Sequence, residues 1–171
     1  DLAVGRIHRA LDGFEKIAVY GDYDADGVTS TAMLYSYLES CGANVMYYIP
    51  EREGEGYGLN VAAIDVLKGK QVKLIITVDN GISSVEEVEY AKSVGIDVVI
   101  SDHHRPQDKI PAAQAVVDPY QQGCGSPFKG FSGVGVAFKL ISALEGPGCD
   151  MEGLLENYAD LVAIGTIADV V

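Results

Sequence analysis

The sequence predicts an α/β fold, with an open, mostly parallel five-stranded sheet, helices on both of its faces, and C-terminal helices after the last strand. Short apolar runs alternate with segments of helical periodicity, which is the pattern of parallel sheets. The strand-like runs are apolar on both faces, as expected for a sheet that is covered on both sides. The 171 residues, 48% of them hydrophobic, are enough for one well-cored domain and too few for two ordinary ones.

Runs that are apolar at nearly every position predict the strands. In chain order these are 17–20, 45–49, 74–78, 98–100 and 115–117. Apolar residues at three- and four-residue spacing predict the helices. These cover 2–14, 28–41, 61–67, 85–94, 136–144 and 154–170. Gly42 and Gly95 follow two of these helices as C-terminal stops. The polar, glycine-rich stretch 50–58 is expected to be an exposed functional loop.

Composition narrows the class of protein. No apolar run reaches the length of a membrane span and the segment 1–13 is too charged for a signal peptide, so a cytoplasmic protein is expected. Cys41, Cys124 and Cys149 are odd in number and widely spaced, which predicts reduced structural thiols rather than disulfides or a zinc site. The formal charge of -13 repels polyanions over most of the surface, so any nucleic-acid contact must be local or supplied elsewhere.

The densest cluster of charge follows the first strand. Asp22, Asp24 and Asp26 stand at alternate positions, and carboxylates this close repel one another unless a cation compensates them. A divalent metal site is therefore predicted. An EF-hand calcium loop begins with the same spacing, but its twelfth position requires a Glu and is Met33 here. A solvated acidic turn between strand and helix is the simpler alternative for this motif alone.

Further candidate ligands follow the other strands. Right-handed crossovers place the carboxyl ends of parallel strands along one edge of the sheet, where open α/β folds bind ligands. The residues expected at this edge are Asp22, Asp24, Asp26, Asp79, Asp102, His103, His104 and Asp118. Asp79 and Asp118 taken singly fit ordinary turns, but the joint placement favours a metal centre. Carboxylates with imidazole suit manganese or magnesium, and such a cluster can hold two ions that act on a phosphoryl group.

Later segments add weaker candidates. The glycine-rich connection 123–135 could cradle a phosphate with its amides, with close packing as an equal alternative. The helix over 154–170 carries an apolar run that ends before Asp169, a carboxylate that needs a cation or a donor wherever it is buried. Tyr57 lies between glycines and could stack on a base or be an ordinary exposed turn residue.

The motif Asp102-His103-His104, with the acidic first motif, the segment 78–81 and a later Asp, resembles the DHH phosphoesterase superfamily over nearly the whole chain. Within that superfamily, four segments in the same order resemble the RecJ-type exonucleases of bacteria. These segments are 20–27, 55–60, 132–140 and 165–169. The resemblance implies a nuclease of DNA repair and recombination, a 5′-to-3′ exonuclease specific for single-stranded DNA that uses two divalent ions, manganese or magnesium.

The resemblance also implies which residues bind metal. The implied ligands are Asp22, Asp24, Asp26, Asp79, His103 and Asp169. Asp24 and Asp26 would bind different ions, and Asp79 would bridge them. Pyrophosphatases and small-oligonucleotide phosphodiesterases of the superfamily carry a His where this chain has Tyr20. Asp22 would either bind the metal in place of that His or contact the ligands without binding the metal itself.

Substrate contacts are implied in the same way. His104 would lie over the scissile phosphate and act in catalysis together with Asp79. The weaker substrate contacts are Arg105, Tyr57, Ser132 and Gly133.

The resemblance ends at Val171, where the family continues into a second catalytic domain and an oligonucleotide-binding module. We therefore expect residues 1–171 to be a single DHH catalytic domain, a fragment with weak or absent nuclease activity that grips DNA mainly through the missing domains. A helicase or a single-strand binding protein is an implied partner. Two other classes stay open: a phosphoesterase for pyrophosphate, cyclic dinucleotides or short oligonucleotides, and a non-catalytic scaffold.

Overall fold

The computed structural model describes residues 1–51 and 58–171 and confirms the predicted α/β class. Its sheet has five parallel strands in the order β2-β1-β3-β4-β5. The strands are β1 (Ile17–Tyr20), β2 (Val45–Tyr48), β3 (Leu74–Val78), β4 (Asp97–Ser101) and β5 (Ala115–Val117). The chain adds β2 on one side of β1 and all later strands on the other. The loops that follow β1 and β3 therefore diverge, and such a switch point is where open α/β sheets bind ligands.

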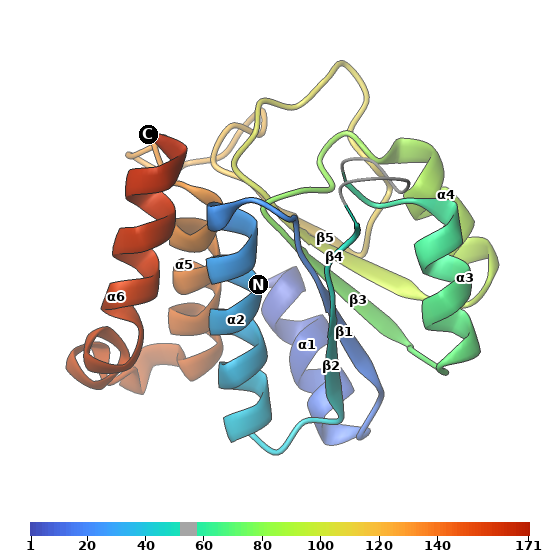
Figure 1. The fold of residues 1–171 in the computed structure, drawn as a ribbon, viewed down its shortest axis with the longest axis horizontal. Coiled ribbons are helices and arrows are strands. Elements are labelled where there is room, and N and C mark those ends of the chain that lie inside the picture. Colours follow the sequence, from blue (N-terminus) through green and yellow to red (C-terminus); the bar gives the residue numbers. More distant parts are fainter. Residues whose placement is uncertain (52–57) are drawn as a thin grey trace.

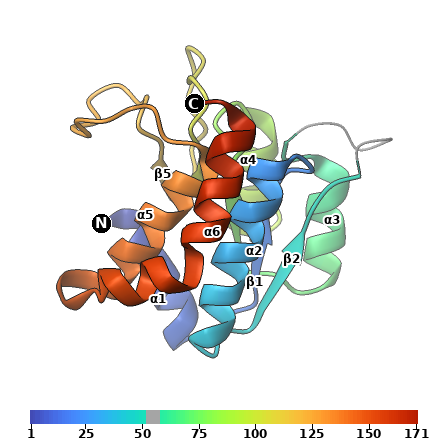
Figure 2. The same cartoon turned by 60° about the vertical axis from the view of Figure 1, so that its left-hand side comes forward.

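Helices cover both faces of this sheet (Figure 1). On one face lie α1 (Leu2–Asp12), α2 (Ala25–Ser40) and α5 (Gly133–Glu145). On the other lie α3 (Val61–Gly69) and α4 (Val85–Ser93). A short 3-10 helix η1 (Gly146–Gly148) leads into α6 (Met151–Asp169). Helix α6 packs on α2 and α5 as an outer layer (Figure 2).

Alternate side chains along each strand pack into two separate hydrophobic cores, one on each face of the sheet. In β1, Ile17 and Val19 belong to the core under α1, α2 and α5, whereas Ala18 and Tyr20 belong to the core under α3 and α4. All four side chains are fully buried. Because successive side chains of a strand point to opposite faces, an apolar run with no polar residue is what a doubly covered strand requires.

Three helices, α2, α5 and α6, begin earlier than their hydrophobic spacing predicts, and the beginnings of α2 and α5 lie at the candidate site. Helix α2 begins at Ala25, because the Asp24 carboxylate accepts a hydrogen bond from the Gly27 amide at 2.8 Å and caps the helix. Helix α5 begins at Gly133, with Ser132 as its N-cap. The first turns consist largely of small and polar residues, so they carry no periodic apolar signal.

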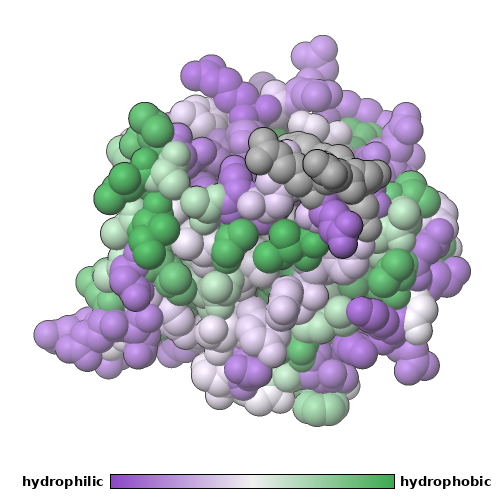
Figure 3. Space-filling model, in the orientation of Figure 1, coloured by the Kyte–Doolittle hydropathy of each residue, from purple (hydrophilic) through white to green (hydrophobic). Residues whose placement is uncertain are grey.

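Apolar side chains remain exposed on the outer helix α6, where hydrophobic residues gather on one side of the molecule (Figure 3). Ile164 and Ile167 expose 54% and 77% of their surface. Among the helices of the described residues, none is long and apolar enough to cross a membrane. Cys41, Cys124 and Cys149 are all unpaired, in agreement with the predicted free thiols.

Candidate metal centre

Acidic and imidazole side chains meet at the carboxyl edge of the sheet. Asp22 follows β1, Asp79 follows β3, and Asp102-His103-His104 follows β4. The far end of α6 brings Asp169 to the same edge, although it lies 66 positions after His103 in the sequence, and its Oδ2 is 3.7 Å from His103 Nδ1. The structure thus brings together residues from four separate loops and helices.

Among the residues that the structure describes, three groups of potential ligands have atoms that lie within 4.8 Å of one another. These groups are Asp22, Asp24 and Asp79; Asp26, His103 and Asp169; and Asp79, His103 and His104. Asp79 and His103 each belong to two groups, so the groups form one connected centre. All six residues expected as ligands are members. Each group has ligand atoms close enough together to hold a metal ion.

His103 stands at the middle of this centre. Its Nε2 lies 3.0 Å from Asp79 Oδ1 and 3.8 Å from Asp26 Oδ2. Asp169 Oδ2 is buried and has no hydrogen-bond partner within the described part of the chain, and the buried His103 Nε2 faces the carboxylates of Asp79 and Asp26. Buried polar atoms without partners are costly. A divalent cation among these atoms would satisfy them, so the residues present fit a metal.

Without a metal, the centre holds protons instead. Burial raises the pKa of the Asp79 carboxyl to about 7, with the nearby Asp26 charge acting in the same direction and His103 opposing it. Burial opposes the charged ring of His103, but the carboxylates of Asp79, Asp169 and Asp26 outweigh it and raise the pKa of His103 to about 9. Protons and metal ions compete for the same atoms.

Backbone amides at the start of α5 hold Asp26. The amides of Gly133 and Val134 donate to its two carboxylate oxygens at 2.6 and 2.8 Å. A carboxylate at a helix N-terminus is favoured by the helix dipole. Gly133 has no room for a side chain, since an added Cβ would lie 2.5 Å from Asp79 Oδ1. Helix α5 is therefore built directly against two of the candidate ligands.

Ser132 and Gly133, two of the residues expected to contact substrate, make hydrogen bonds within the protein. Ser132 is 1% exposed, and its hydroxyl lies 3.3 Å from the Gly135 amide that it caps and 2.9 Å from Thr166 Oγ1. The Gly133 amide is used by Asp26. The amides at the glycine-rich entry to α5 therefore bind the Asp26 carboxylate of the protein itself. The sequence had left two possible roles for these glycines, binding of a phosphate or close packing.

Asp102 supports the centre in a way that the sequence did not show. Its Oδ1 lies 2.7 Å from His104 Nδ1 and accepts the amides of His103 and His104, while Oδ2 accepts the Ile82 amide at 2.9 Å. Burial disfavours its charge, but these partners lower the pKa of Asp102 below its ordinary value. The Asp102 contact raises the pKa of His104. One buried carboxylate thus orients the His104 ring and the loop after β3.

Three other residues noted in the sequence, Asp118, Arg105 and Tyr20, are not members of the ligand groups. Asp118 is buried and its Oδ1 accepts the Tyr120 amide at 2.6 Å. The Arg105 guanidinium is exposed and sits 5.2 Å from the centre of the Tyr120 ring. The Tyr20 hydroxyl donates to the Gly58 carbonyl at 2.9 Å, on the α3 side of the sheet. Tyr57 lies outside the described residues.

Comparison with known proteins agrees with this geometry. The sequence profile of the DHH family, N-terminal domain, matches residues 16–166. The single-stranded-DNA-specific exonuclease RecJ of Bacillus subtilis (strain 168) is 50% identical over 169 residues, which cover 99% of this chain. The chain spans only 21% of that relative's length.

Solved structures give the same neighbours. A crystal structure of exonuclease RecJ bound to manganese matches with a TM-score of 0.87 and 39% identity, covering 98% of this chain and 42% of the other. RecJ from Thermus thermophilus in complex with Mg²⁺ matches with a TM-score of 0.62 and 32% identity, covering 99% of this chain and 20% of the other. The resemblance read from the motifs is confirmed, and the chain belongs to the DHH family, whose N-terminal domain it contains.

Proposed function

We propose that this chain is the catalytic DHH domain of a metal-dependent exonuclease that hydrolyses single-stranded DNA in the 5′-to-3′ direction. The observation that carries the proposal is the connected centre in which Asp79 and His103 are shared between groups of potential ligands. The RecJ relative is named for single-strand-specific exonuclease activity, and related structures hold manganese or magnesium. A centre of this kind suits phosphodiester hydrolysis by two divalent ions.

The proposed ligands are Asp22, Asp24, Asp26, Asp79, His103 and Asp169. When bound, two divalent ions supply positive charge beside a phosphoryl group and lower the pKa of water. The protein's own part is positional. The amides of Gly133 and Val134 fix the Asp26 carboxylate, and the loop after β3 presents Asp79 with a positive φ of 61°. Asp tolerates this left-handed conformation better than most residues.

His104 is proposed to act on the phosphate itself. Its side chain is 46% exposed at the edge of the centre, and Asp102 holds Nδ1 at 2.7 Å. This contact favours the protonated ring, the form that donates a hydrogen bond to a phosphate oxygen or a proton to the departing 3′ oxygen. Arg105 lies one position further along in an exposed loop and is proposed as a weaker phosphate contact.

Further features of the complete protein belong to the proposal as well. A second catalytic domain and an oligonucleotide-binding module would supply most of the grip on DNA, because this chain carries a formal charge of -13. A cytoplasmic location and a helicase or single-strand binding protein as partner are proposed from the same relationship. Size-exclusion chromatography of the full-length protein with each partner tests the latter.

Two substitutions separate metal binding from action on the phosphate. Asp79→Asn removes a charge shared by two ligand groups, so manganese affinity measured by calorimetry should fall at least tenfold and activity should be lost. His104→Gln should bind manganese almost normally, with kcat on 5′-phosphorylated single strands falling roughly 10²- to 10⁴-fold. Equal loss of metal in both variants would contradict the assigned roles.

Asp108→Asn is the matched control. It makes the same change of charge on an exposed side chain in the loop after β4, so it should leave both metal affinity and kcat unchanged. Duplex DNA, cyclic dinucleotides and pyrophosphate serve as competing substrates. Preferential turnover of pyrophosphate or cyclic dinucleotides would place the chain among the small-molecule phosphoesterases.

A further inference from the structure

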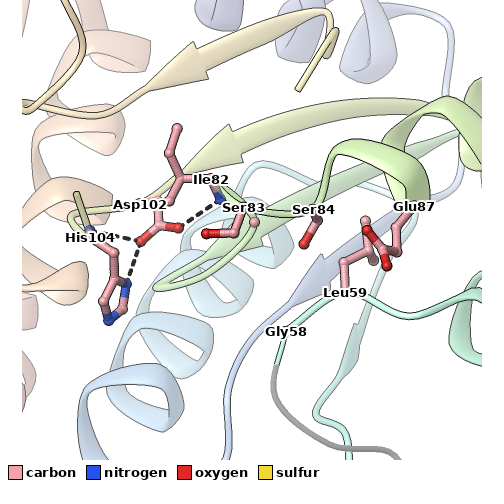
Figure 4. Close-up of a pocket in the computed structure, with 9 residues that line it drawn as sticks. Gly58, Leu59, Ile82, Ser83, Ser84, Glu87, Asp102 and His104 are labelled. Atoms are coloured by element: carbon pink, nitrogen blue, oxygen red, sulfur yellow. Dashed lines mark hydrogen bonds and ion pairs between the residues drawn. The ribbon is translucent and has the colours of Figure 1, made fainter. Parts of the chain in front are cut away.

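A cavity of about 390 Å³ opens beside His104, on the side of the loop after β3 (Figure 4). This volume is within the range of small-ligand sites. Besides Asp102 and His104, its lining comes from the segment after residue 57, the loop after β3 and the first turn of α4. These lining residues are Gly58, Leu59, Gly81, Ile82, Ser83, Ser84 and Glu87. Figure 4 shows His104 at one end of the lining and Leu59 and Glu87 at the other.

Ser84 and Glu87 have the spacing of a helix capping box but do not form one. In that motif, the N-cap serine accepts the amide of the third helical residue and the glutamate reaches back to the serine amide. Here Ser84 has φ and ψ of -86° and 59° and makes no side-chain cap hydrogen bond. The Ser84 amide donates to the Gly81 carbonyl at 3.0 Å instead. The capping box is therefore not formed.

The Ser84 hydroxyl points into the cavity. Ser84 is 9% exposed, and among the described residues its hydroxyl has no hydrogen-bond partner. A Cβ added at Gly58, across the cavity, would lie 3.9 Å from this oxygen. A polar side chain that is nine-tenths buried is normally satisfied. A ligand in the cavity would satisfy this hydroxyl.

The charge of the lining selects the kind of ligand. Glu87 borders the cavity, and its carboxylate repels a phosphate. The Asp102 carboxylate, which also borders the cavity, is already paired with His104. Carboxylate oxygens accept hydrogen bonds, so the suitable partner is a neutral group with N–H or O–H donors. Leu59 and Ile82 add small apolar surfaces to the wall. Each nucleobase offers an N–H on its Watson–Crick edge together with an apolar ring face.

We propose that this cavity is the subsite for the nucleoside of the terminal nucleotide, in which Glu87 and Ser84 form hydrogen bonds with the base while the phosphate on its 3′ oxygen lies at the metal centre. The proposal rests on the proposed function, because it takes the substrate to be a nucleic acid. A carboxylate and a hydroxyl accept an N–H from any base, which suits a nuclease without base preference. The subsite and His104 are joined, since Asp102 holds both His104 Nδ1 and the Ile82 amide.

Nucleotide binding tests the subsite without any need for turnover. The probes are 2′-deoxyadenosine 3′-monophosphate, written dAMP below, and deoxyribose 3-phosphate, which lacks the base, each titrated with Mg²⁺ into ¹⁵N-labelled protein and followed by NMR. The amides of residues 82–87 should shift with dAMP and much less with the sugar phosphate. Glu87→Gln should weaken dAMP binding about tenfold and Ser84→Ala about three- to fivefold, with little change for the sugar phosphate.

Glu86→Gln is the matched control, because it removes the same charge from the neighbouring exposed residue of the same helical turn. It should leave dAMP affinity unchanged. The proposal is overturned if dAMP does not bind, if the shifts lie elsewhere, or if all three variants bind dAMP like the parent. Shifts at residues 82–87, together with a full-length protein that hydrolyses no single-stranded DNA, would support the subsite and reject the exonuclease. Hydrolysis of single-stranded DNA together with shifts outside residues 82–87 would support the exonuclease and reject the subsite.

Discussion

Gly133→Ala should damage both the stability of the fold and the metal centre, through a single methyl group. An ideal Cβ at Gly133 would lie 2.5 Å from both Cβ and Oδ1 of Asp79 and 2.7 Å from its Cγ. Carbon atoms pack at about 3.5 Å, so helix α5 and Asp79 must separate by about 1 Å. Neither yields easily, because the Gly133 amide is bound to Asp26 and Asp79 already has a positive φ.

Overpacking of this kind costs about 1–3 kcal/mol. Replacing a glycine in a helix returns at most about 1 kcal/mol, so the free energy of unfolding should fall by about 1–2 kcal/mol in EDTA. Gly5→Ala is the matched control: Gly5 is exposed in the middle of α1 with nothing within 4 Å of an added Cβ. It should raise the free energy of unfolding by about 0.5–1 kcal/mol.

Urea unfolding followed by circular dichroism measures both changes, and calorimetry with Mn²⁺ measures the second effect. The 1 Å displacement moves Asp79 relative to Asp26, so manganese affinity should fall at least tenfold in Gly133→Ala and stay constant in Gly5→Ala. The reasoning is refuted if the two variants change stability in the same direction and bind manganese equally. That result would mean that α5 and Asp79 move apart without cost.

Two further predictions concern charge. Arg6 is buried and lies 2.6 Å from Asp97 and 2.7 Å from Glu15. Arg6→Met should therefore lower the free energy of unfolding by about 2 kcal/mol. Manganese affinity should not change, because Asp97 begins β4 at the opposite edge of the sheet. In EDTA, the free energy of unfolding should fall as pH rises from about 4 to about 9. The pKa values of Asp79 (about 7) and His103 (about 9) in the folded protein exceed their ordinary values of 3.8 and 6.5. The folded state therefore binds more protons than the unfolded state over this range, and loses that stabilisation as pH rises. Saturating Mg²⁺ should remove this decline, and a metal-free stability that rises over this range would contradict the assigned protonation.

The sequence was most informative where apolar runs have sharp polar ends. The bounds of β1, β3 and β5 match the prediction, since each run is followed at once by glycine or aspartate. The same property exposed the candidate ligands, because the carboxyl ends of parallel strands share one edge whatever the details of packing. The position of Asp79 beside His103 needed only the order of the strands.

Other features of the site depend on contacts that leave no local pattern. The Gly133 and Val134 amides reach Asp26 across more than 100 positions in the sequence, and glycine there is equally consistent with binding a phosphate. Asp102 was expected at the edge, but its hold on the Ile82 amide depends on how two loops meet. Ser84 and Glu87 match a capping box by spacing, and only the backbone angles at Ser84 show that the box does not form.

The negative charge of this chain is compatible with a polyanionic substrate if the phosphate and the base of a nucleotide bind at two different places. With a formal charge of -13, to which the carboxylates of the metal-free centre contribute, most of the surface repels phosphate. Divalent ions reverse the sign only where Asp79 and His103 gather them, so phosphate should be drawn to that point and only when metal is present. Beside it, the uncompensated Glu87 disfavours phosphate and accepts N–H donors. Metal binding and the acidic subsite together would therefore fix which end of a nucleotide faces His104.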